Sequence, residues 1–330
     1  MRNNREYVGA FAPEFKMFLN EKRACGLKYV EEERLLRKLD EICVKCNRVH
    51  GLGKDAVQEF VTPRPNWSQG TYEGHIRITT QIAKFLNLHG ISAYMPDTKL
   101  KLGVYRSFSP YIFSVEEIRK IFDVADNLYS GRSYIRSYDF YPAIFRLLYS
   151  SGLRISEALH LMIKDVDLAN GTVFIKNAKN HKDRLLPLNA QVIPYLVYYA
   201  EKYHKTYRSD DFYFSPPHGG HYNKSTVYHR FRDILFKIGI SHDGRENSGP
   251  RLHCLRHTFC VHSLRQFLVN GVDHRAALPI LSAYMGHSSI AATAKYLRLT
   301  AEAYPEISTK LEKEFGGLIP KLEVSNDETD

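Results

Sequence analysis

The sequence has no long apolar run and few cysteines. No stretch of its 330 residues approaches the roughly 18 to 20 apolar residues that a membrane-spanning helix needs. The first residues, MRNNREYVGAF, are basic and lack the apolar core of a signal peptide. The five cysteines are an odd number in a long chain, which does not indicate a disulfide framework. These absences predict a cytoplasmic protein with no membrane partner.

A second pair of closely spaced cysteines is also missing. Cys43 and Cys46 form a single CxxC, inside an expected amphipathic helix. A structural zinc site of this kind needs further ligands at matching spacing. We therefore interpret both residues as ordinary, partly buried thiols. Internal repeats and low-complexity tracts are absent too, and the acidic last ten residues, KLEVSNDETD, predict a terminal tail.

What the sequence has in excess is positive charge. Its 46 Lys and Arg residues exceed its 36 Asp and Glu residues, which gives a net charge of +10 and a pI near 9.2. Such an excess favours a polyanionic partner such as nucleic acid, and less often an anionic membrane surface. The hydrophobic content of 44% is typical of a globular protein, and the length allows two domains.

The periodicity of the chain changes near residue 105. Before it, apolar residues recur at helical spacing in four segments, which predicts a small bundle of helices over residues 13–25, 29–46, 55–60 and 71–89. Residues 91–112 show no sustained period, which predicts a linker made basic by Lys99, Lys101 and Arg106. We expect an N-terminal helical domain over residues 1–105 and a second domain over residues 106–330.

The second domain has a mixed pattern that begins with a capping box at Ser114–Glu117. GTVFIK (171–176) and DRLLPL (183–188) are typical of two short strands, joined by a hairpin loop, NAKNHK. Helices are expected at residues 115–129, 139–151, 156–163, 189–204, 224–238, 253–269 and 288–297. The predicted fold class is therefore mainly α with a small β-sheet.

The segment HCLRH, His253 to His257, is compatible with two kinds of site. Histidines four apart on a helix can bind a metal, whereas a histidine and an arginine three apart can bind a phosphate. A zinc protease helix has a glutamate after its first histidine, where this sequence has Cys254. The permanent cation of Arg256 also opposes a divalent metal. Phosphate binding is favoured, and we expect no metal and no cofactor.

A phosphate site predicts further basic residues and a nucleophile. SGLRISEAL (151–159) places Arg154 at a turn before a helix, where an arginine can donate two hydrogen bonds to phosphate oxygens. MGHSSIAATAKYL (285–297) places His287 before a helix and Tyr296 nine residues later. Taken alone, Arg154 is better explained as an ordinary surface arginine.

Four ordered segments together resemble the tyrosine recombinases, the phage integrase family. SGLRISEAL resembles the first arginine motif of that family, NAKNHKDRLLPL its lysine hairpin, HCLRHTF its HxxR motif, and MGHSSIAATAKYL its Gly-His motif followed by tyrosine. The segment between HCLRH and Gly286 is longer than in compact members, and the extra residues, expected near 273–279, would lengthen a loop or a helix. The resemblance implies a C-shaped clamp on DNA, formed by a helical N-terminal domain and a mixed α+β catalytic domain.

The resemblance also implies a set of catalytic residues. Tyr296 would attack the scissile phosphate and form a 3′-phosphotyrosyl link. Two arginines would hold the non-bridging oxygens, a lysine would protonate the 5′-oxygen, and the histidines would assist as base or as hydrogen-bond donors. The implied set is Arg154, Lys179, His253, Arg256, His287 and Tyr296.

Alternatives remain for some of these positions. Lys176 and Lys182 flank the same loop as Lys179, although alignment on DRLLPL favours Lys179. Tyr284 lies near His287 but precedes the Gly-His turn. Two supporting residues are expected beside the set: Glu157, which can orient Arg154 through a salt bridge or be a solvated charge, and His257, which is interpreted as a packing neighbour of the phosphate site.

The predicted function is site-specific recombination of double-stranded DNA, with integration or excision of a mobile element preferred. The resemblance implies a homodimer at each site and a tetramer in the synapse, with accessory DNA-bending proteins or a partner recombinase as possible further partners. Three alternatives stay open: Xer-like dimer resolution, relaxation of DNA as by a type IB topoisomerase, and regulation by a catalytically silent DNA-binding protein.

Overall fold

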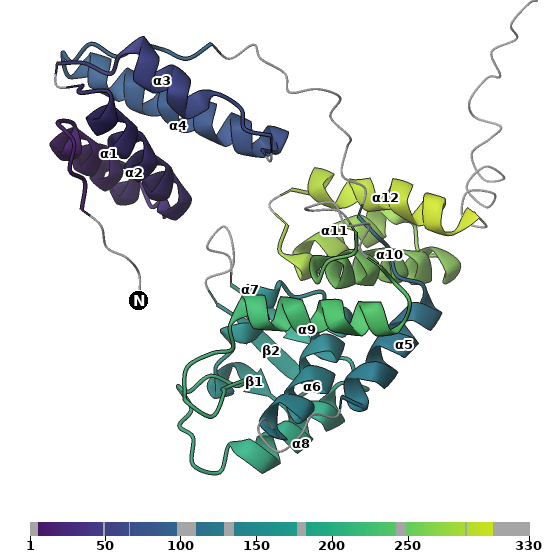
Figure 1. The fold of residues 1–330 in the computed structure, drawn as a ribbon. Helices are drawn as coiled ribbons and strands as arrows, with labels where there is room; N and C mark the ends of the chain where they lie inside the picture. Colours follow the sequence, from purple (N-terminus) through teal and green to yellow (C-terminus); the bar gives the residue numbers. More distant parts are fainter. Residues whose placement is uncertain are drawn as a thin grey trace, which may run out of the picture. The chain divides into compact units, whose positions relative to one another are not determined.

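The computed structural model describes residues 6–48, 50–65, 67–97, 110–128, 135–176, 183–241, 249–287 and 289–305. The chain divides into two compact units, Met1–Phe108 and Ser109–Asp330, shown in Figure 1. The boundary expected near residue 105 lies outside the described residues. So do the three basic linker residues, Lys99, Lys101 and Arg106.

The first unit is a bundle of four helices, as the periodicity predicts. Pro13 lies in the first turn of α1, and the Ser68 side chain caps α4 by accepting a hydrogen bond from Thr71 N. Fully buried apolar side chains from the four helices form one core, which includes Phe15, Leu36 and Leu86. The helices are α1 (Ala12–Ala24), α2 (Val30–Lys45), α3 (Lys54–Val61) and α4 (Gln69–Leu88).

The second unit is mainly helical, with a small sheet. Its antiparallel sheet has the order β1-β2-β3, and Val173 of β2 pairs with Leu186 of β3. Its elements are α5 (Val115–Asp126), α6 (Ile135–Ser151), α7 (Ile155–Leu159), η1 (Ile163–Asp165), β1 (Val166–Asp167), β2 (Thr172–Ile175), β3 (Arg184–Pro187), α8 (Ile193–Tyr203), α9 (Lys224–Lys237), α10 (His253–Val269), α11 (His274–Met285) and α12 (Ala291–Ala303).

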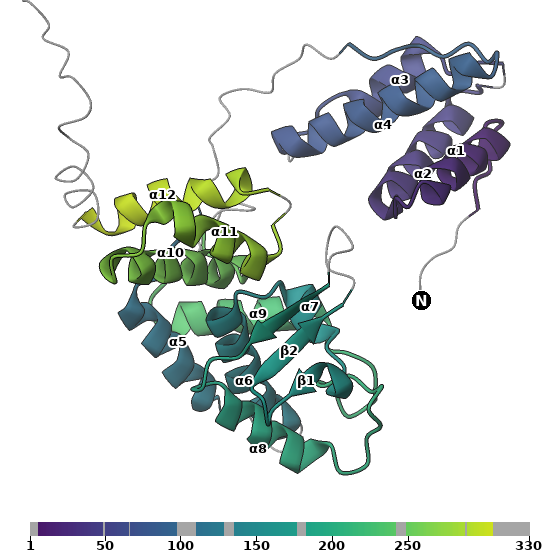
Figure 2. The same cartoon turned by 180° about the vertical axis from the view of Figure 1, so that it is seen from behind.

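Two apolar clusters stabilise this second unit. One joins α5, α6, α8 and α9 to the inner face of the sheet, and Phe140, Phe145 and Phe231 are fully buried in it. The other joins α10, α11 and α12, which lie together as a separate group in both ribbon views (Figures 1 and 2). α10 belongs to both, because Leu255 contributes to the first cluster and Val261 to the second. α10 therefore connects the two halves of the unit.

The structure differs from the expectations in the segment after HCLRH. The residues near 273–279, expected to lengthen a loop or helix, form the first half of α11. The Asp273 side chain caps this helix by accepting a hydrogen bond from Arg275 N, and Pro279 lies inside it. The helix expected at residues 288–297 begins later, at Ala291, and extends to Ala303. The two-residue strand β1 was not predicted.

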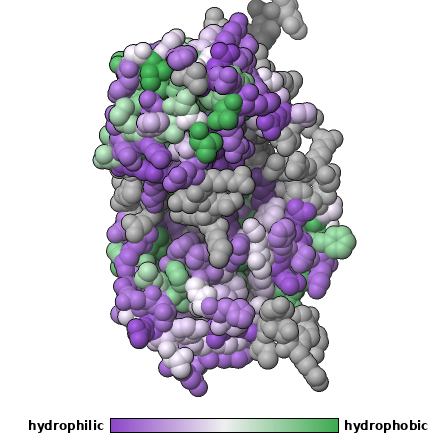
Figure 3. All heavy atoms as spheres, turned by 60° about the vertical axis from the view of Figure 1, so that its left-hand side comes forward, coloured by the Kyte–Doolittle hydropathy of each residue, from purple (hydrophilic) through white to green (hydrophobic). Residues whose placement is uncertain are grey.

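The surface is largely hydrophilic on the face drawn in Figure 3, where hydrophobic side chains form small separate groups. Scattered exposed apolar residues of this kind are normal for globular proteins. Within the described ranges, no helix is both long enough and apolar enough to span a bilayer. All five cysteines have free thiols.

Candidate active site

Arg256, the arginine of HCLRH, is the most deeply buried guanidinium of the candidate site. It lies on the first turn of α10 and is 3% exposed. Its Nη1 donates to Gly152 O at 2.5 Å and its Nη2 to Met285 O at 2.6 Å. Burial and the neighbouring Arg154 lower the pKa of Arg256 to about 10, which leaves it protonated at neutral pH. Arg256 thereby joins three segments that are distant in the sequence.

Gly152 has the conformation that this contact needs. Its φ is +58°, in the left-handed region that favours glycine. A Cβ atom there would lie 2.5 Å from Cδ1 of Phe259 and 2.8 Å from Sδ of Met285. Glycine is therefore required both for the backbone turn and for the close approach of this turn to α10 and α11.

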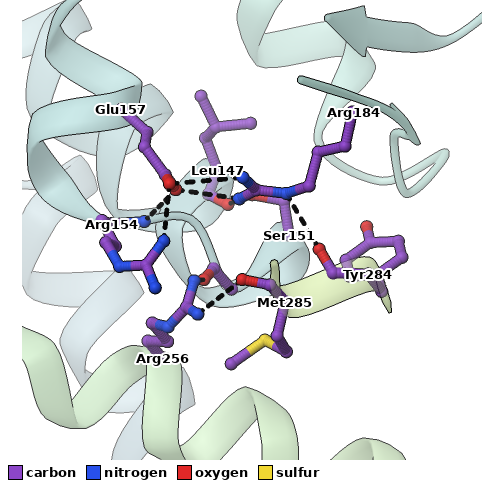
Figure 4. A network of polar contacts seen from close by, with 9 residues as sticks. Leu147, Ser151, Arg154, Glu157, Arg184, Arg256, Tyr284 and Met285 are labelled. Carbon is purple, nitrogen blue, oxygen red and sulfur yellow. Dashed lines mark hydrogen bonds and ion pairs between the residues drawn. The ribbon is translucent and has the colours of Figure 1, made fainter. Parts of the chain in front are cut away.

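Arg154 follows this turn and is held by Glu157 (Figure 4). Its Nη1 donates to Glu157 Oε1 at 2.8 Å, and its backbone N–H donates to Oε2 at 2.9 Å. The Arg154 side chain keeps 22% of its surface exposed, whereas that of Glu157 is only 6% exposed. Glu157 is therefore a buried partner rather than a solvated charge, and it fixes the start of α7.

Arg184 is a site residue that the sequence analysis missed. It lies on β3 and donates from Nη2 to Glu157 Oε2 at 2.9 Å and from Nε to Tyr284 O at 3.1 Å (Figure 4). Burial opposes ionisation of Glu157, but the hydrogen bonds from Arg184 and Arg154 outweigh it and hold the pKa of Glu157 below its ordinary value. The Glu157 carboxylate thus links β3 to α7, and the hydrogen bond from Arg184 to Tyr284 O links β3 to the end of α11.

Tyr296 lies on α12 and is 1% exposed. Its hydroxyl is 2.7 Å from Nδ1 of His257, which is itself 7% exposed. Burial raises the pKa of Tyr296 well above its ordinary value, while the charges of Arg256 and Arg154 act in the opposite direction. His257, interpreted from the sequence as a packing neighbour, contacts the candidate nucleophile directly.

Two further histidines belong to the candidate site. The His287 ring is parallel to the Tyr296 ring at a centroid distance of 6.2 Å, and its Nδ1 contacts Thr293 Oγ1 at 2.7 Å. His253 is exposed at the start of α10, and its ring meets His257 edge to face at 4.7 Å. Desolvation, followed by the charges of Arg256 and Arg154, lowers the pKa of both His253 and His287 to about 4, so both are neutral at pH 7.

The predicted lysine, Lys179, lies outside the described residues, and so does Lys182. Lys176 is described and its Nζ donates to Asp165 Oδ1 at 2.5 Å. The alternative tyrosine, Tyr284, donates its hydroxyl hydrogen to Pro187 O at 3.0 Å. Tyr284 is thus engaged with the end of β3, and Lys176 with the carboxylate of Asp165.

Five of the six predicted catalytic residues come from the N-cap of α7, from α10, from α12 and from the turn before α12. Their charges act on one another: those of Arg154 and Arg256 affect the pKa values of His253, His287 and Tyr296. Two guanidinium groups beside neutral imidazoles and one phenol can bind an anionic group with paired oxygens, such as a phosphodiester. The signal for Arg184 was its place next to the loop NAKNHK, but its partner Glu157 lies 27 residues away.

The fold agrees with what the comparisons with known proteins find. The sequence model of the phage integrase family matches residues 112–303. The chain belongs to this family, the tyrosine recombinases, whose members cleave and rejoin DNA strands. The matched region contains all the predicted catalytic positions.

Curated relatives are similar over part of their length. A Sinorhizobium fredii protein named as an integrase/recombinase, y4rB, is 30% identical over 62% of this chain and 66% of its own length. Tyrosine recombinase XerA of Pyrococcus horikoshii is 29% identical over 64% of this chain and 65% of its own. Tyrosine recombinase XerC of Oceanobacillus iheyensis is 28% identical over 69% of this chain and 69% of its own length. The chain therefore spans about two thirds of the length of these relatives.

Solved structures show the same fold. The integrase of the Tn1549 transposon, in complex with a circular intermediate DNA, has a TM-score of 0.60 at 18% identity, and the match covers 86% of this chain and 94% of that one. The XerH site-specific recombinase, in a post-cleavage complex with a palindromic difH substrate, has a TM-score of 0.58 at 21% identity, covering 80% and 74%.

Proposed function

We propose that this protein cleaves and rejoins double-stranded DNA through a covalent 3′-phosphotyrosyl intermediate, with Tyr296 as nucleophile. The observation that carries the proposal is that Arg154 just before α7, Arg256 on α10 and Tyr296 on α12 lie close enough for their charges to act on one another. Membership of the phage integrase family supports the reaction type. A covalent link keeps the energy of the phosphodiester, so rejoining needs no ATP.

The two arginines stabilise the transition state. In the proposed reaction, Arg154 and Arg256 hold the non-bridging oxygens of the scissile phosphate and offset the charge that builds up on them. Both guanidinium groups are already fixed, Arg154 by Glu157 and Arg256 by two backbone carbonyls. A guanidinium that is already fixed needs little reorganisation when the charge develops on the phosphate, which is the physical basis of this kind of catalysis.

The remaining residues act on the leaving group and the oxygens. Lys179 protonates the 5′-oxygen, which would otherwise leave as an alkoxide. His287 donates a hydrogen bond to the phosphate, and His253 assists as base or as donor. Since His253 and His287 are neutral in the free protein, each still carries one N–H that can donate.

DNA binding follows from the charge and the two units. We propose that the units clamp duplex DNA at a specific site, with the linker residues Lys99, Lys101 and Arg106 along the phosphate backbone. The net charge of +10 supports this, and binding should weaken steeply with salt. The complexes of Tn1549 integrase and XerH with DNA support the same partner. A dimer at each site and a tetramer in the synapse belong to this proposal.

For the biological role we propose integration or excision of a mobile element. The likeness in fold to the Tn1549 transposon integrase supports this choice. The XerA and XerC relatives favour a second candidate, resolution of chromosome or plasmid dimers. Sequencing the DNA that the purified protein selects from genomic fragments separates the two: a site at the ends of a mobile element supports the first, and a single chromosomal site the second.

Replacement of Tyr296 by Phe tests the nucleophile. The variant should form no covalent adduct with a nicked duplex carrying the selected site, and it should bind that duplex as the unmodified protein does. Tyr284→Phe is the matched control, because it removes a hydroxyl that bonds to Pro187 O on β3. An adduct that survives in Tyr296→Phe, measured by gel shift under denaturing conditions, would exclude Tyr296.

The same preparation separates recombination from topoisomerase activity. A type IB topoisomerase relaxes supercoiled DNA of any sequence as a monomer. We expect relaxation by this protein only on plasmids that carry the selected site. Robust relaxation of a plasmid without that site would favour the topoisomerase alternative.

A further inference from the structure

The hydroxyl of Tyr296 faces an imidazole that the family resemblance does not assign. Its Oη lies 2.7 Å from Nδ1 of His257, and the two side chains are 1% and 7% exposed. A phenol that attacks phosphorus has to lose its proton as the new bond forms, and a base must lie within about 2.6 to 3.2 Å to take it. His257 meets this geometric requirement.

The other two histidines of the site are placed differently. Nδ1 of His287 is engaged with Thr293 Oγ1 at 2.7 Å, and the ring is stacked parallel to that of Tyr296. His253 is exposed at the start of α10, where it can meet a ligand from solvent. In the described part of the chain, the hydrogen bond recorded for the Tyr296 hydroxyl is the one with His257.

We propose that His257 is the general base of strand cleavage, an assignment that rests on the proposed function of Tyr296. As Oη of Tyr296 bonds to phosphorus, its proton passes to Nδ1 of His257. The bond between phosphorus and the 5′-oxygen breaks, and that oxygen keeps the electron pair and takes a proton from Lys179. In rejoining, the 5′-hydroxyl attacks phosphorus and returns its proton to Lys179, while His257 returns its own to the phenolate.

The surroundings keep the imidazole unprotonated in the free protein, as a base requires. Burial, together with the charges of four neighbours, lowers the pKa of His257 to about 3; these neighbours are His253, Lys295, Arg256 and His287. With its proton on Nε2, the neutral ring accepts the phenol hydrogen at Nδ1. A bound phosphodiester adds negative charge beside these groups, which raises the pKa of His257. The base therefore becomes stronger when the substrate is in place.

This role divides the work between two histidines on one face of α10. His257 takes the proton of the nucleophile, and His253, one turn earlier and exposed, donates a hydrogen bond to a phosphate oxygen. Their rings are in edge-to-face contact, so each restrains the other. The division can be tested, because removing the base and removing the donor affect different parts of the reaction.

His257→Asn tests the base with little change in shape. The Oδ1 of an asparagine lies near the position of Nδ1 and accepts a hydrogen bond, but it takes up no proton. The measurement is single-turnover adduct formation on a nicked duplex with the selected site and sulfur in place of the 5′-bridging oxygen. Sulfur leaves without protonation, so this rate reports the attack by Tyr296 and not the action of Lys179. We expect a loss of about 100-fold or more.

His253→Asn is the matched control, since asparagine can still donate to a phosphate oxygen. Its rate of adduct formation on the sulfur substrate should fall by less than that of His257→Asn. A rate for His257→Asn within about threefold of the unmodified protein would show that a hydrogen-bond acceptor suffices, and would overturn the proposal. A larger loss in His253→Asn would assign the base to His253. Thermal unfolding and DNA binding of both variants show whether they are folded.

The pH dependence decides the question if His257→Asn does not fold. On the sulfur substrate, His253→Asn should keep a rate that falls about tenfold per pH unit below the pKa of the base in the complex. A rate that does not change with pH in that variant overturns the proposal. If the unmodified protein forms no adduct that depends on Tyr296, the proposed function itself fails, which is a different result from a normal rate in His257→Asn.

Discussion

The two units of the chain differ in the burial of the most enclosed ion pair that the structure describes in each. In the helical unit, the ion pairs that the structure describes lie toward the surface: Arg34 and Glu31 are 58% and 72% exposed, and Arg37 and Glu33 are 25% and 24% exposed. In the second unit, the pair of Arg184 with Glu157 is 9% and 6% exposed. The Glu157 carboxylate also accepts from Arg154, so two guanidinium groups share one buried anion.

This difference shows where charged side chains hold the backbone and other side chains in a fixed position. An exposed ion pair contributes little to stability, because water and salt screen it. A buried pair costs desolvation and is kept only if every partner is in place. In the second unit, the hydrogen bonds of Glu157 fix Arg154, and those of Arg184 link β3 to the end of α11. These are the parts of the candidate site that have to stay in register.

We expect Glu157→Ala to give the largest difference in stability between the two units. It leaves Arg184 buried without its carboxylate and releases Arg154, so we expect a loss of about 3 to 5 kcal/mol in the stability of the second unit. The same variant should also lose adduct formation. Urea unfolding followed by circular dichroism measures the stability.

Glu33→Ala in the helical unit is the matched control. Glu33 also pairs with two arginines, Arg23 and Arg37, but at partial exposure, so we expect about 1 kcal/mol or less. The sequence has one tryptophan, Trp67, which lies in the helical unit and reports its unfolding by fluorescence. Equal losses in the two variants would show that burial of the pair does not matter.

Gly152→Ala tests the backbone side of the same comparison. At Gly152 the added Cβ meets Phe259 and Met285 as well as the strain of a positive φ, so we expect a loss of about 2 to 4 kcal/mol. Gly26 ends α1 at a φ of +81° with nothing within 4 Å of an added Cβ. Gly26→Ala should therefore cost about 1 kcal/mol. Urea unfolding measures both, and a cost at Gly152 no larger than at Gly26 would contradict the close packing.

Much of the fold could be predicted from local patterns. The four helices of the first unit, the hairpin of β2 and β3, and the capping box at Ser114 all depend on neighbouring residues, and the structure confirms them. α11 was not predicted as a separate helix, because the residues near 273–279 were expected only to lengthen a loop or helix. Its buried face, Ala277, Leu278, Leu281, Ser282 and Met285, has helical spacing and was the signal that could have identified it.

The contacts of the candidate site could not be predicted in this way. Motif order identified Arg154, Arg256 and Tyr296, but nothing in HCLRH distinguishes the histidine that contacts Tyr296 from the one that does not. That depends on the packing of α10 against α12, where the bonded residues are 39 positions apart. Arg184 was missed for the same reason, since its partners lie on α7 and at the end of α11.

The smallest expected effect is the pH dependence of the two carboxylates. The pKa of Glu157 is held below its ordinary value of 4.5, so its charge contributes stability above that pH, and the contribution is lost as the pH falls through the folded-state pKa. The stability difference between the unmodified protein and Glu157→Gln should therefore shrink as the pH falls from about 7 to about 3. The pKa of Glu33 is lowered too, but this residue is 24% exposed, so Glu33→Gln should show a weaker trend in Trp67 fluorescence. A difference for Glu157→Gln that stays constant over this range would show that the shape of the side chain, and not its charge, holds Arg184 and Arg154.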